Sequence, residues 1–105
     1  MNEIICGQSV IKLDKYGFLE NVDDWNEEVA LELAYIADNL FLSDEHWTLI
    51  RYVRKFFISN GTTPMLRRLS SETGYTLKRL YELFPQGPTK GLYRIAGMQK
   101  PANCS

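Results

Sequence analysis

The sequence holds few of the residues on which most catalytic and metal sites depend. Its two cysteines, Cys6 and Cys104, lie at opposite ends of the chain and form no CxxC pair, which argues against a disulfide scaffold and a zinc site. His46 is the only histidine, and with no second histidine or cysteine beside it we interpret it as structural rather than functional. Neither a carboxylate pair nor a glycine-rich phosphate loop is evident. Classical catalysis by this chain alone is therefore not expected.

Long apolar runs are also lacking. A membrane-spanning helix needs about twenty consecutive apolar residues, and no such stretch and no signal-peptide core is found. With 105 residues, of which 45% are apolar and 24% charged, the composition is that of a globular protein that can bury a core. The sequence thus predicts one domain over residues 1–105, a cytoplasmic location with reduced thiols, and no membrane partner.

The net charge of −1 hides an uneven distribution of charge. Residues 1–45 contain two lysines and eleven acidic residues, whereas residues 46–105 contain ten lysines and arginines and two acidic residues. One interpretation is that the two halves neutralise each other in the fold. The other is that the basic half faces an acidic partner or a polyanion. The candidate partner surface in the second case comprises Arg51, Arg54, Arg67 and Arg68.

Apolar periodicity and capping residues predict a mainly α fold of the α+β class, a small helical bundle with an N-terminal β-hairpin. The hairpin is expected within residues 4–11, with a further turn at 14–17. A first helix is expected at about 25–39, with Asp24 in the capping box, and a second at about 43–58, with Ser43 as N-cap. A third helix is expected from Thr63 to the turn at 72–75, with Met65, Leu66 and Leu69 facing inward. A fourth is expected from Thr76 to Pro85.

The last twenty-one residues have an unusual composition. Residues 85–105 hold three of the four prolines and three of the seven glycines, which predicts an extended, mobile arm at about 85–105 after a body at about 1–84. Cys104 lies near the tip of this arm. From the residues alone two interpretations of Cys104 remain open, a working thiol and an incidental tail residue.

The two short helices predicted within residues 63–84 also permit a different function. With a glycine turn between them they are similar to a helix-turn-helix, in which Arg67, Arg68, Lys78 and Arg79 would contact DNA phosphates. A DNA-binding regulator is therefore an alternative of another functional class.

Four ordered blocks of residues carry a resemblance to a known family. They are Ser43-x-Glu45-His46-Trp47 with Arg51-Tyr52-Val53-Arg54, then Thr63-Pro64 with Arg67 and Leu69, then Leu80-Tyr81-x-Leu83-Phe84-Pro85, and finally Pro85-x-Gly87-Pro88-x-Lys90 with Ile95-Ala96-Gly97-x-x-Lys100-Pro101-x-x-Cys104. Gly17-Phe18-Leu19 and Trp25 agree with its N-terminal part. The whole set resembles the DsrC/TusE family.

This resemblance implies a DsrC-like fold and a sulfur carrier that takes a persulfide sulfur onto Cys104, with no other cofactor. In the DsrC type a second arm cysteine lies eleven residues earlier, where this chain has Tyr93. One arm cysteine is the TusE-like pattern, which implies a relay for 2-thiolation of the wobble uridine of tRNA. The connection at 70–75 is shorter than in the TusE pattern, so a divergent paralogue in another sulfur-transfer pathway remains an alternative to the tRNA relay. A further alternative is an accessory (gamma-type) subunit of dissimilatory sulfite reductase.

The site implied by the resemblance centres on Cys104. Lys100, Pro101, Arg94, Gly97 and Lys90 are expected to dock the arm and to supply charge near the thiol, and the glycines are expected to let the arm swing. The partners implied are a sulfur-donor relay protein, an acceptor thiouridylase that holds tRNA, and sulfite reductase in the alternative case. Such a protein is a sulfurtransferase-type co-substrate carrier rather than a self-sufficient enzyme.

Overall fold

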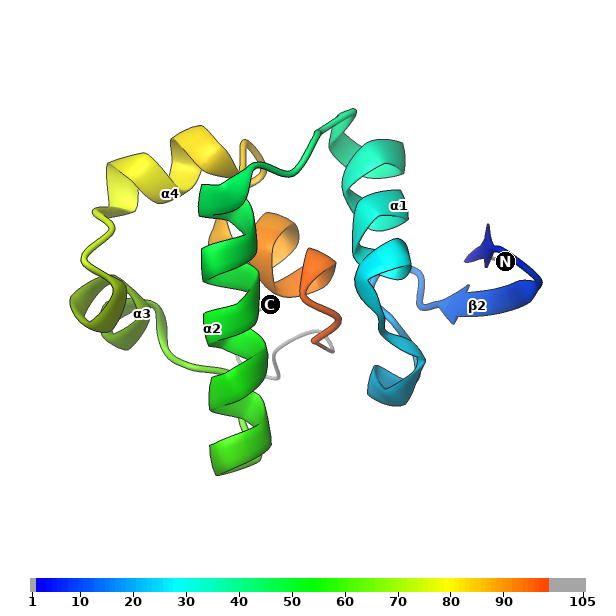
Figure 1. Cartoon of the computed structure of the whole chain (residues 1–105), viewed down its shortest axis with the longest axis horizontal. Coiled ribbons are helices and arrows are strands. Elements are labelled where there is room, and N and C mark those ends of the chain that lie inside the picture. The colour runs from blue at the N-terminus through cyan, green and yellow to red at the C-terminus, as the bar shows by residue number, and fades with distance from the viewer. Residues whose placement is uncertain (1, 99–105) are drawn as a thin grey trace.

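The chain begins with an antiparallel hairpin and continues as a helical bundle (Figure 1). The computed structural model describes residues 2–98, apart from the side chains at positions 2, 37, 38 and 89. The predicted mainly α fold with an N-terminal hairpin is confirmed. The elements are β1 (Asn2–Cys6), β2 (Ser9–Leu13), the 3₁₀ turn η1 (Val22–Asp24), α1 (Glu27–Asp38), α2 (Asp44–Asn60), α3 (Leu66–Thr73), α4 (Leu77–Leu83) and the π-helical segment η2 (Pro88–Tyr93).

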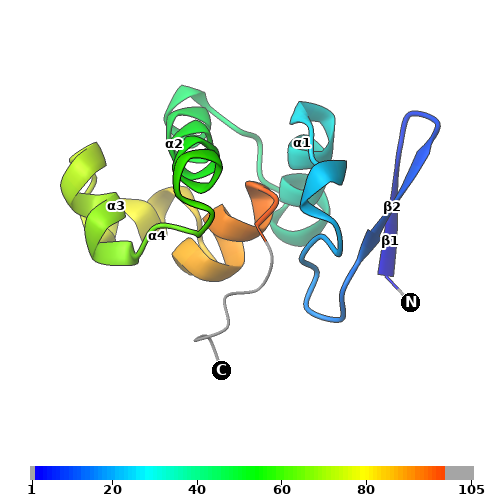
Figure 2. The same ribbon diagram turned by 90° about the horizontal axis from the view of Figure 1, so that it is seen from below.

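The hairpin packs one face on α1. Ile4 pairs with Ile11 across the two strands, and both side chains are buried together with Leu13. Because side chains alternate along a strand, Ile5 and Val10 point to the opposite face and are exposed. Figure 2 shows the hairpin at one end of the molecule, beside α1, with α3 at the other end.

Helix α1 starts two residues later than the capping box predicted. Asn26 is the N-cap, and its side chain accepts a hydrogen bond from the amide of Val29 at 2.9 Å. Asp24 instead ends η1, which has its own cap at Asn21. The helix ends at Asn39 with a left-handed φ of 51°.

Helix α2 runs through the middle of the molecule. Ser43 is its N-cap as predicted, and Gly61, whose φ of 75° is left-handed, is its C-cap. It extends two residues beyond the predicted end, to Asn60. Its buried residues Leu49, Ile50 and Val53 form the centre of the core.

Helix α3 differs most from the prediction. It begins at Leu66 with Met65 as N-cap rather than at Thr63-Pro64, because Pro64 is a buried residue of the extended connection. Met65 is 78% exposed, and only Leu69 is fully buried, so the expected inward positions of Met65 and Leu66 were wrong. Helix α4 has the predicted cap, because the Thr76 side chain accepts from the amide of Arg79 at 3.1 Å.

The predicted boundary between body and arm is wrong. Residues 87–98 turn back into the molecule as η2 and the turn after it, between α1 and α2 (Figures 1 and 2), and Leu92, Ile95 and Met98 are fully buried. Proline is tolerated at the start of a helix, where Pro88 lies. At Gly91 an added Cβ would lie 2.9 Å from the Cβ of Phe84, so this glycine permits close packing rather than swinging. The body therefore extends at least to Met98.

Candidate functional site

Residues 95–98 are the last described part of the chain before Cys104, and we call them the arm root. The amide of Gly97 donates to the Arg94 carbonyl at 3.1 Å, and the amide of Met98 donates to the Tyr93 carbonyl at 3.0 Å. This pair of hydrogen bonds is the Schellman motif that ends a helix, with Gly97 in the left-handed conformation at a φ of 83°. This motif sets the direction of the chain at Met98.

Two side chains from distant elements hold the arm root, and we call them the clasp. The indole Nε1–H of Trp25 donates to the Ile95 carbonyl at 2.9 Å. The Nη1 of Arg54, on α2, donates to the Ala96 carbonyl at 3.0 Å. The Arg54 guanidinium also lies over the Trp25 ring, 4.1 Å from its centroid, as a cation–π contact. The clasp thus satisfies two of the carbonyls that a helix C-terminus leaves without intrahelical partners.

Packing makes Gly97 part of the same unit. A Cβ added there would lie 2.4 Å from Cδ1 of Trp25, a distance at which one of the two groups must move. Burial lowers the pKa of Arg54, and the nearby Asp23 carboxylate opposes this shift. Arginine starts from so high a pKa that the guanidinium remains a cation at neutral pH. The clasp is therefore a charged contact at physiological pH.

Arg94 and Lys90, predicted to act on the arm, belong to the body. Arg94 is 5% exposed, and its guanidinium donates to the Lys90 carbonyl at 2.7 Å and to the Leu33 carbonyl at 3.4 Å. It joins η2 to α1, so its charge is directed into the body. The Lys90 side chain is exposed. Lys100, Pro101 and Cys104 lie outside the described residues, and their roles stay predictions.

Tyr93, which stands where the DsrC pattern has a second arm cysteine, is a core residue. Its side chain is 5% exposed, and its hydroxyl donates to the Pro64 carbonyl at 2.8 Å. This bond ties η2 to the extended connection before α3. The residue at position 93 therefore has a structural role in this chain.

Replacing Tyr93 with Phe should lower the free energy of unfolding by about 1 kcal/mol, because the buried Pro64 carbonyl loses its donor while the ring is kept. Urea denaturation of the two proteins measures this difference. Tyr35→Phe is the matched control, since Tyr35 is 54% exposed and should change stability little. Equal losses for both variants would contradict a structural role for the Tyr93 hydroxyl.

The four arginines of the predicted partner surface are used in different ways. Arg54 belongs to the clasp, Arg51 lies 4.0 Å from Glu27, and Arg68 bonds Glu72 at 2.9 Å. Arg67 is exposed on α3. The DNA-binding alternative is weakened by similar contacts, because Arg79 forms ion pairs with both Glu45 and Glu82. The second helix of that motif, α4, also has only seven residues.

Glu72 receives two donors, and these contacts shift the pKa values of Tyr52 and of Glu72 itself. The Tyr52 hydroxyl donates to one carboxylate oxygen and Arg68 to the other. Burial and then this hydrogen bond raise the pKa of Tyr52 to about 12, and the hydrogen bonds from Tyr52 and Arg68 lower the pKa of Glu72. These contacts join α2 to α3.

Cys6 is a poor candidate for the reactive thiol. It ends β1 and is partly buried, and burial followed by the Glu32 and Glu28 carboxylates raises the pKa of its thiol. The thiolate is the nucleophile in sulfur exchange, so a raised pKa reduces the reactive fraction at neutral pH. Across residues 2–98, no group of three or more His, Cys, Asp and Glu side chains is placed to hold a metal ion.

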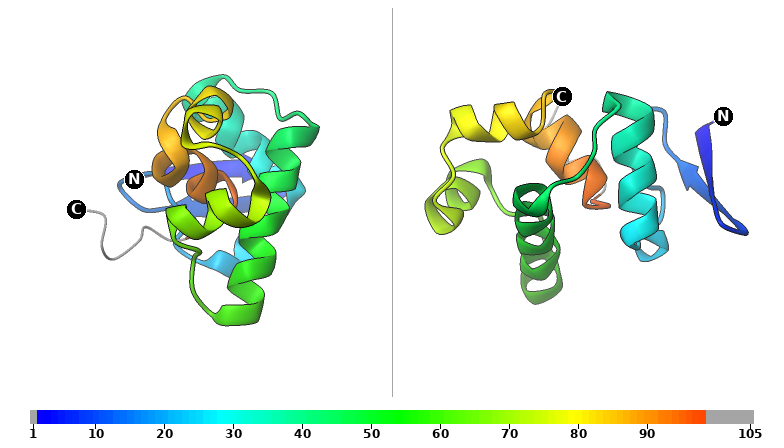
Figure 3. Two further views of the ribbon diagram at one scale, coloured as in Figure 1. Left: turned by 90° about the vertical axis from the view of Figure 1, so that its left-hand side faces the viewer. Right: turned by 45° about the horizontal axis from the view of Figure 1, so that its top comes forward.

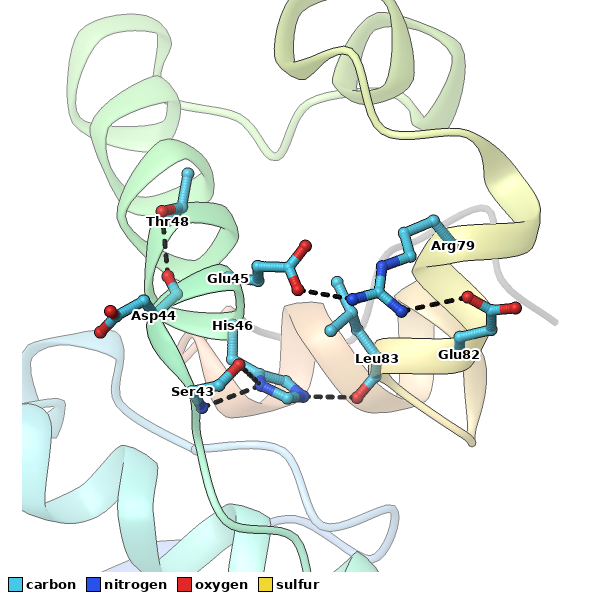
Figure 4. Close-up of polar contacts among 8 residues, drawn as sticks. All are labelled: Ser43, Asp44, Glu45, His46, Thr48, Arg79, Glu82 and Leu83. Atoms are coloured by element: carbon cyan, nitrogen blue, oxygen red, sulfur yellow. Dashed lines mark hydrogen bonds and ion pairs between the residues drawn. The ribbon is translucent and has the colours of Figure 1, made fainter.

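His46 has a structural role, which Figure 4 shows. Its Nε2 lies 2.6 Å from the Leu83 carbonyl, which can only accept, so Nε2 carries the proton. Its Nδ1 then accepts from the Ser43 amide at 3.0 Å and from the Ser43 hydroxyl at 2.7 Å. The ring is buried and joins the start of α2 to the end of α4.

The clasp is the part of the site that sequence reasoning missed. Trp25 and the arm root are 70 residues apart, and no periodicity or cap links them. The sequence predicts that Arg54 belongs to a partner surface, because an arginine on a helix normally faces solvent. Nothing local in the sequence marks either residue as a contact of the arm root.

Comparison with known proteins identifies the family. The family described as "DsrC like protein" matches residues 6–105. The chain belongs to this family. It is 37% identical over 107 residues to the "Sulfite reductase, dissimilatory-type subunit gamma" of Nitratidesulfovibrio vulgaris, covering 99% of each chain. It is also 38% identical over 102 residues to "Sulfurtransferase TusE" of Photorhabdus laumondii, covering 90% of each. The resemblance predicted from the sequence is confirmed.

Solved structures show the same fold in the DsrC-like family. The oxidized gamma-subunit of the dissimilatory sulfite reductase (DsrC) from Archaeoglobus fulgidus superposes with a TM-score of 0.92 at 38% identity, over 99% of this chain and 100% of that one. DsrC from Allochromatium vinosum superposes with a TM-score of 0.86 at 33% identity, over 99% and 98%. None of the helices between residues 2 and 98 has both the length and the apolar character that crossing a membrane requires.

Proposed function

We propose that this protein is a sulfur carrier in which Cys104 accepts a persulfide sulfur and passes it to an acceptor. Membership of a family that includes named sulfurtransferases supports the carrier role. The arm root is the structural observation that carries the proposal. The body is clasped up to Met98, and the six residues from there to Cys104 can span roughly 20 Å at about 3.3 Å per residue. The thiol therefore has a reach that a core cysteine lacks.

The reaction is an exchange between sulfur atoms. The Cys104 thiolate attacks the outer sulfur of a donor persulfide, a new S–S bond forms at Cys104, and the donor leaves as a thiolate. An acceptor thiolate then attacks the outer sulfur on Cys104 and releases the Cys104 thiolate. The carrier is regenerated, and no external oxidant or reductant is consumed.

We further propose that the acceptor pathway is 2-thiolation of the wobble uridine of tRNA. The two-thiol chemistry of the DsrC pattern needs a second cysteine at position 93. This chain has Tyr93 there, which is a hydrogen-bonded core residue. A single transferable thiol is the simpler device, and it suits a relay that gives and receives one sulfur at a time. The relatives named TusE agree with this assignment.

The tRNA assignment predicts that a strain without this gene loses 2-thiolated wobble uridine. Mercury-containing gels separate thiolated from unthiolated tRNA and measure the loss. The wild-type gene should restore thiolation, Cys6→Ser should restore it equally, and Cys104→Ser should not. Unchanged thiolation in the deletion strain would contradict the tRNA pathway and leave sulfur carriage itself standing.

A role with sulfite reductase is the second candidate. The gamma subunit from Nitratidesulfovibrio vulgaris matches this chain over 99% of both lengths, which favours it. Co-purification of the chain with dissimilatory sulfite reductase, together with normal tRNA thiolation in the deletion strain, would support this candidate over the first.

A further inference from the structure

Helix α1 carries an exposed apolar surface that the proposed sulfur chemistry does not use. Leu31, Tyr35, Ile36 and Phe41 are 48%, 54%, 53% and 79% exposed. The rings of Tyr35 and Phe41 lie 6.3 Å apart, so the residue beyond the helix is continuous with the helix surface. Leu31 and Tyr35 are one turn apart and adjacent on the helix. We call these four residues the α1 face.

Two glutamates border the α1 face. Glu28, Glu32 and Ile36 form a row at intervals of four residues beside the row of Leu31 and Tyr35. Like charges four residues apart destabilise a helix, so this arrangement costs stability. Glu28, Leu31 and Glu32 also line a hollow of about 180 Å³ with Ile5 and Cys6 of β1. The face is thus both apolar and acidic, and the hairpin tip borders it.

The basic half of the chain does not neutralise these two glutamates. Between residues 2 and 98, ion pairs join Arg51 to Glu27 and Arg79 to Glu45 across the two halves, and none includes Glu28 or Glu32. The interpretation that the halves neutralise each other is therefore right only in part. The negative charge beside the α1 face remains available to an outside cation.

Exposed apolar side chains that include two aromatic rings in contact are typical of a protein-binding surface, because aromatic side chains that become buried dominate interface energetics. The bordering glutamates repel nucleic acid phosphates and anionic lipid. They attract lysine and arginine, and such residues beside an apolar surface would complement the face in charge. We propose that the α1 face docks a protein partner whose contact surface is an apolar stripe bordered by basic side chains.

The position of the face fits a partner in sulfur transfer, a step that rests on the proposed function. Trp25 of the clasp comes two residues before the first residue of α1, and η2 lies beside the helix, as the right-hand view of Figure 3 shows. Twelve residues of helix are about 18 Å long at 1.5 Å per residue. Six residues, the number from Met98 to Cys104, can span at most roughly 20 Å. A partner that binds the α1 face and extends to the N-terminal end of the helix, beside Trp25, would therefore bring its own cysteine within reach of Cys104.

The test uses two synthetic helical peptides of about eighteen residues with leucines on one face. One carries lysines beside the leucines and the other carries glutamates at the same positions. Both are titrated into the full-length Cys104→Ser protein, so that binding cannot depend on the reactive thiol. Fluorescence anisotropy measures affinity, and NMR amide shifts locate the contact. We expect the lysine peptide to bind and the shifts to cluster at residues 28–41.

Matched variants make the result specific. Tyr35→Ala with Phe41→Ala should weaken binding of the lysine peptide at least tenfold. Met65→Ala with Tyr81→Ala removes two equally exposed apolar side chains elsewhere and should change it less than twofold. Glu28→Gln with Glu32→Gln should reduce the dependence of binding on salt. The six substituted side chains are exposed, apart from that of Glu32, which is partly exposed. Circular dichroism verifies that each variant folds.

The proposal is overturned by any of three results: no saturable binding at millimolar peptide, equal binding of the glutamate peptide, or an unchanged affinity in the Tyr35→Ala and Phe41→Ala variant. Sulfur uptake by Cys104 is measured separately on the wild-type protein. Binding at the face without sulfur uptake would sink the carrier function and keep the docking surface. Sulfur uptake without binding at the face would contradict the docking surface and leave the carrier function standing.

Discussion

Replacing Cys104 with Ser should abolish the uptake of sulfur from a persulfide donor. The wild-type protein, incubated with a small-molecule persulfide and then freed of it, should gain one sulfur atom by intact mass. A serine hydroxyl is not ionised at neutral pH and forms no persulfide, so the gain should disappear completely rather than partly. Mass spectrometry of the C-terminal peptide would locate the added sulfur.

Cys6→Ser is the internal control for this experiment. Its thiol is partly buried and has a raised pKa beside Glu32 and Glu28, so its loss should leave uptake unchanged. Because the chain has two cysteines, the two variants account for all of its thiols. Uptake that survives in Cys104→Ser and vanishes in Cys6→Ser would show that the arm assignment is wrong.

Replacing Gly97 with Ala should destabilise the protein by about 2–5 kcal/mol. A left-handed conformation costs a residue with a Cβ about 1–2 kcal/mol, and the φ of Gly97 is 83°. Overpacking typically costs about 1–3 kcal/mol more, and the new methyl group would lie 2.4 Å from Cδ1 of Trp25. Urea denaturation followed by far-UV circular dichroism measures the loss.

Gly61→Ala separates the two causes. Gly61 also ends a helix, with a φ of 75°, but a methyl group added there would have no atom within 4 Å. This variant should therefore lose only the conformational part, about 1–2 kcal/mol. If the two variants lose the same stability, the contact between the arm root and Trp25 does not contribute to the fold as the geometry indicates.

Local features of the sequence were predictable because their causes lie within a few residues. Ser43 and Thr76 cap helices as expected, and the hairpin turns at Gly7. A cap depends on one side chain and an amide two or three residues later, which the sequence displays directly. The start of α3 was not predictable in this way, because Pro64 is held in the core by the Tyr93 hydroxyl.

The arm boundary shows the limit of composition as evidence. Three prolines and three glycines predicted an extended segment from residue 85, yet Leu92, Ile95 and Met98 are core residues. Their burial depends on the space that α1 and α2 leave between them, which no local pattern reveals. Gly91 and Gly97 permit close packing against Phe84 and Trp25, respectively.

The sequence by itself determined the family, the order of the helices and the single cysteine near the C-terminus, because these follow from residue identity and short-range spacing. Only the tertiary structure decided that the body continues to Met98 and what holds the arm root. Trp25, Arg54 and residues 95–97 meet across 42 to 70 positions of chain. Such contacts form because several elements pack at once, and a one-dimensional pattern does not record which distant side chains that packing brings together.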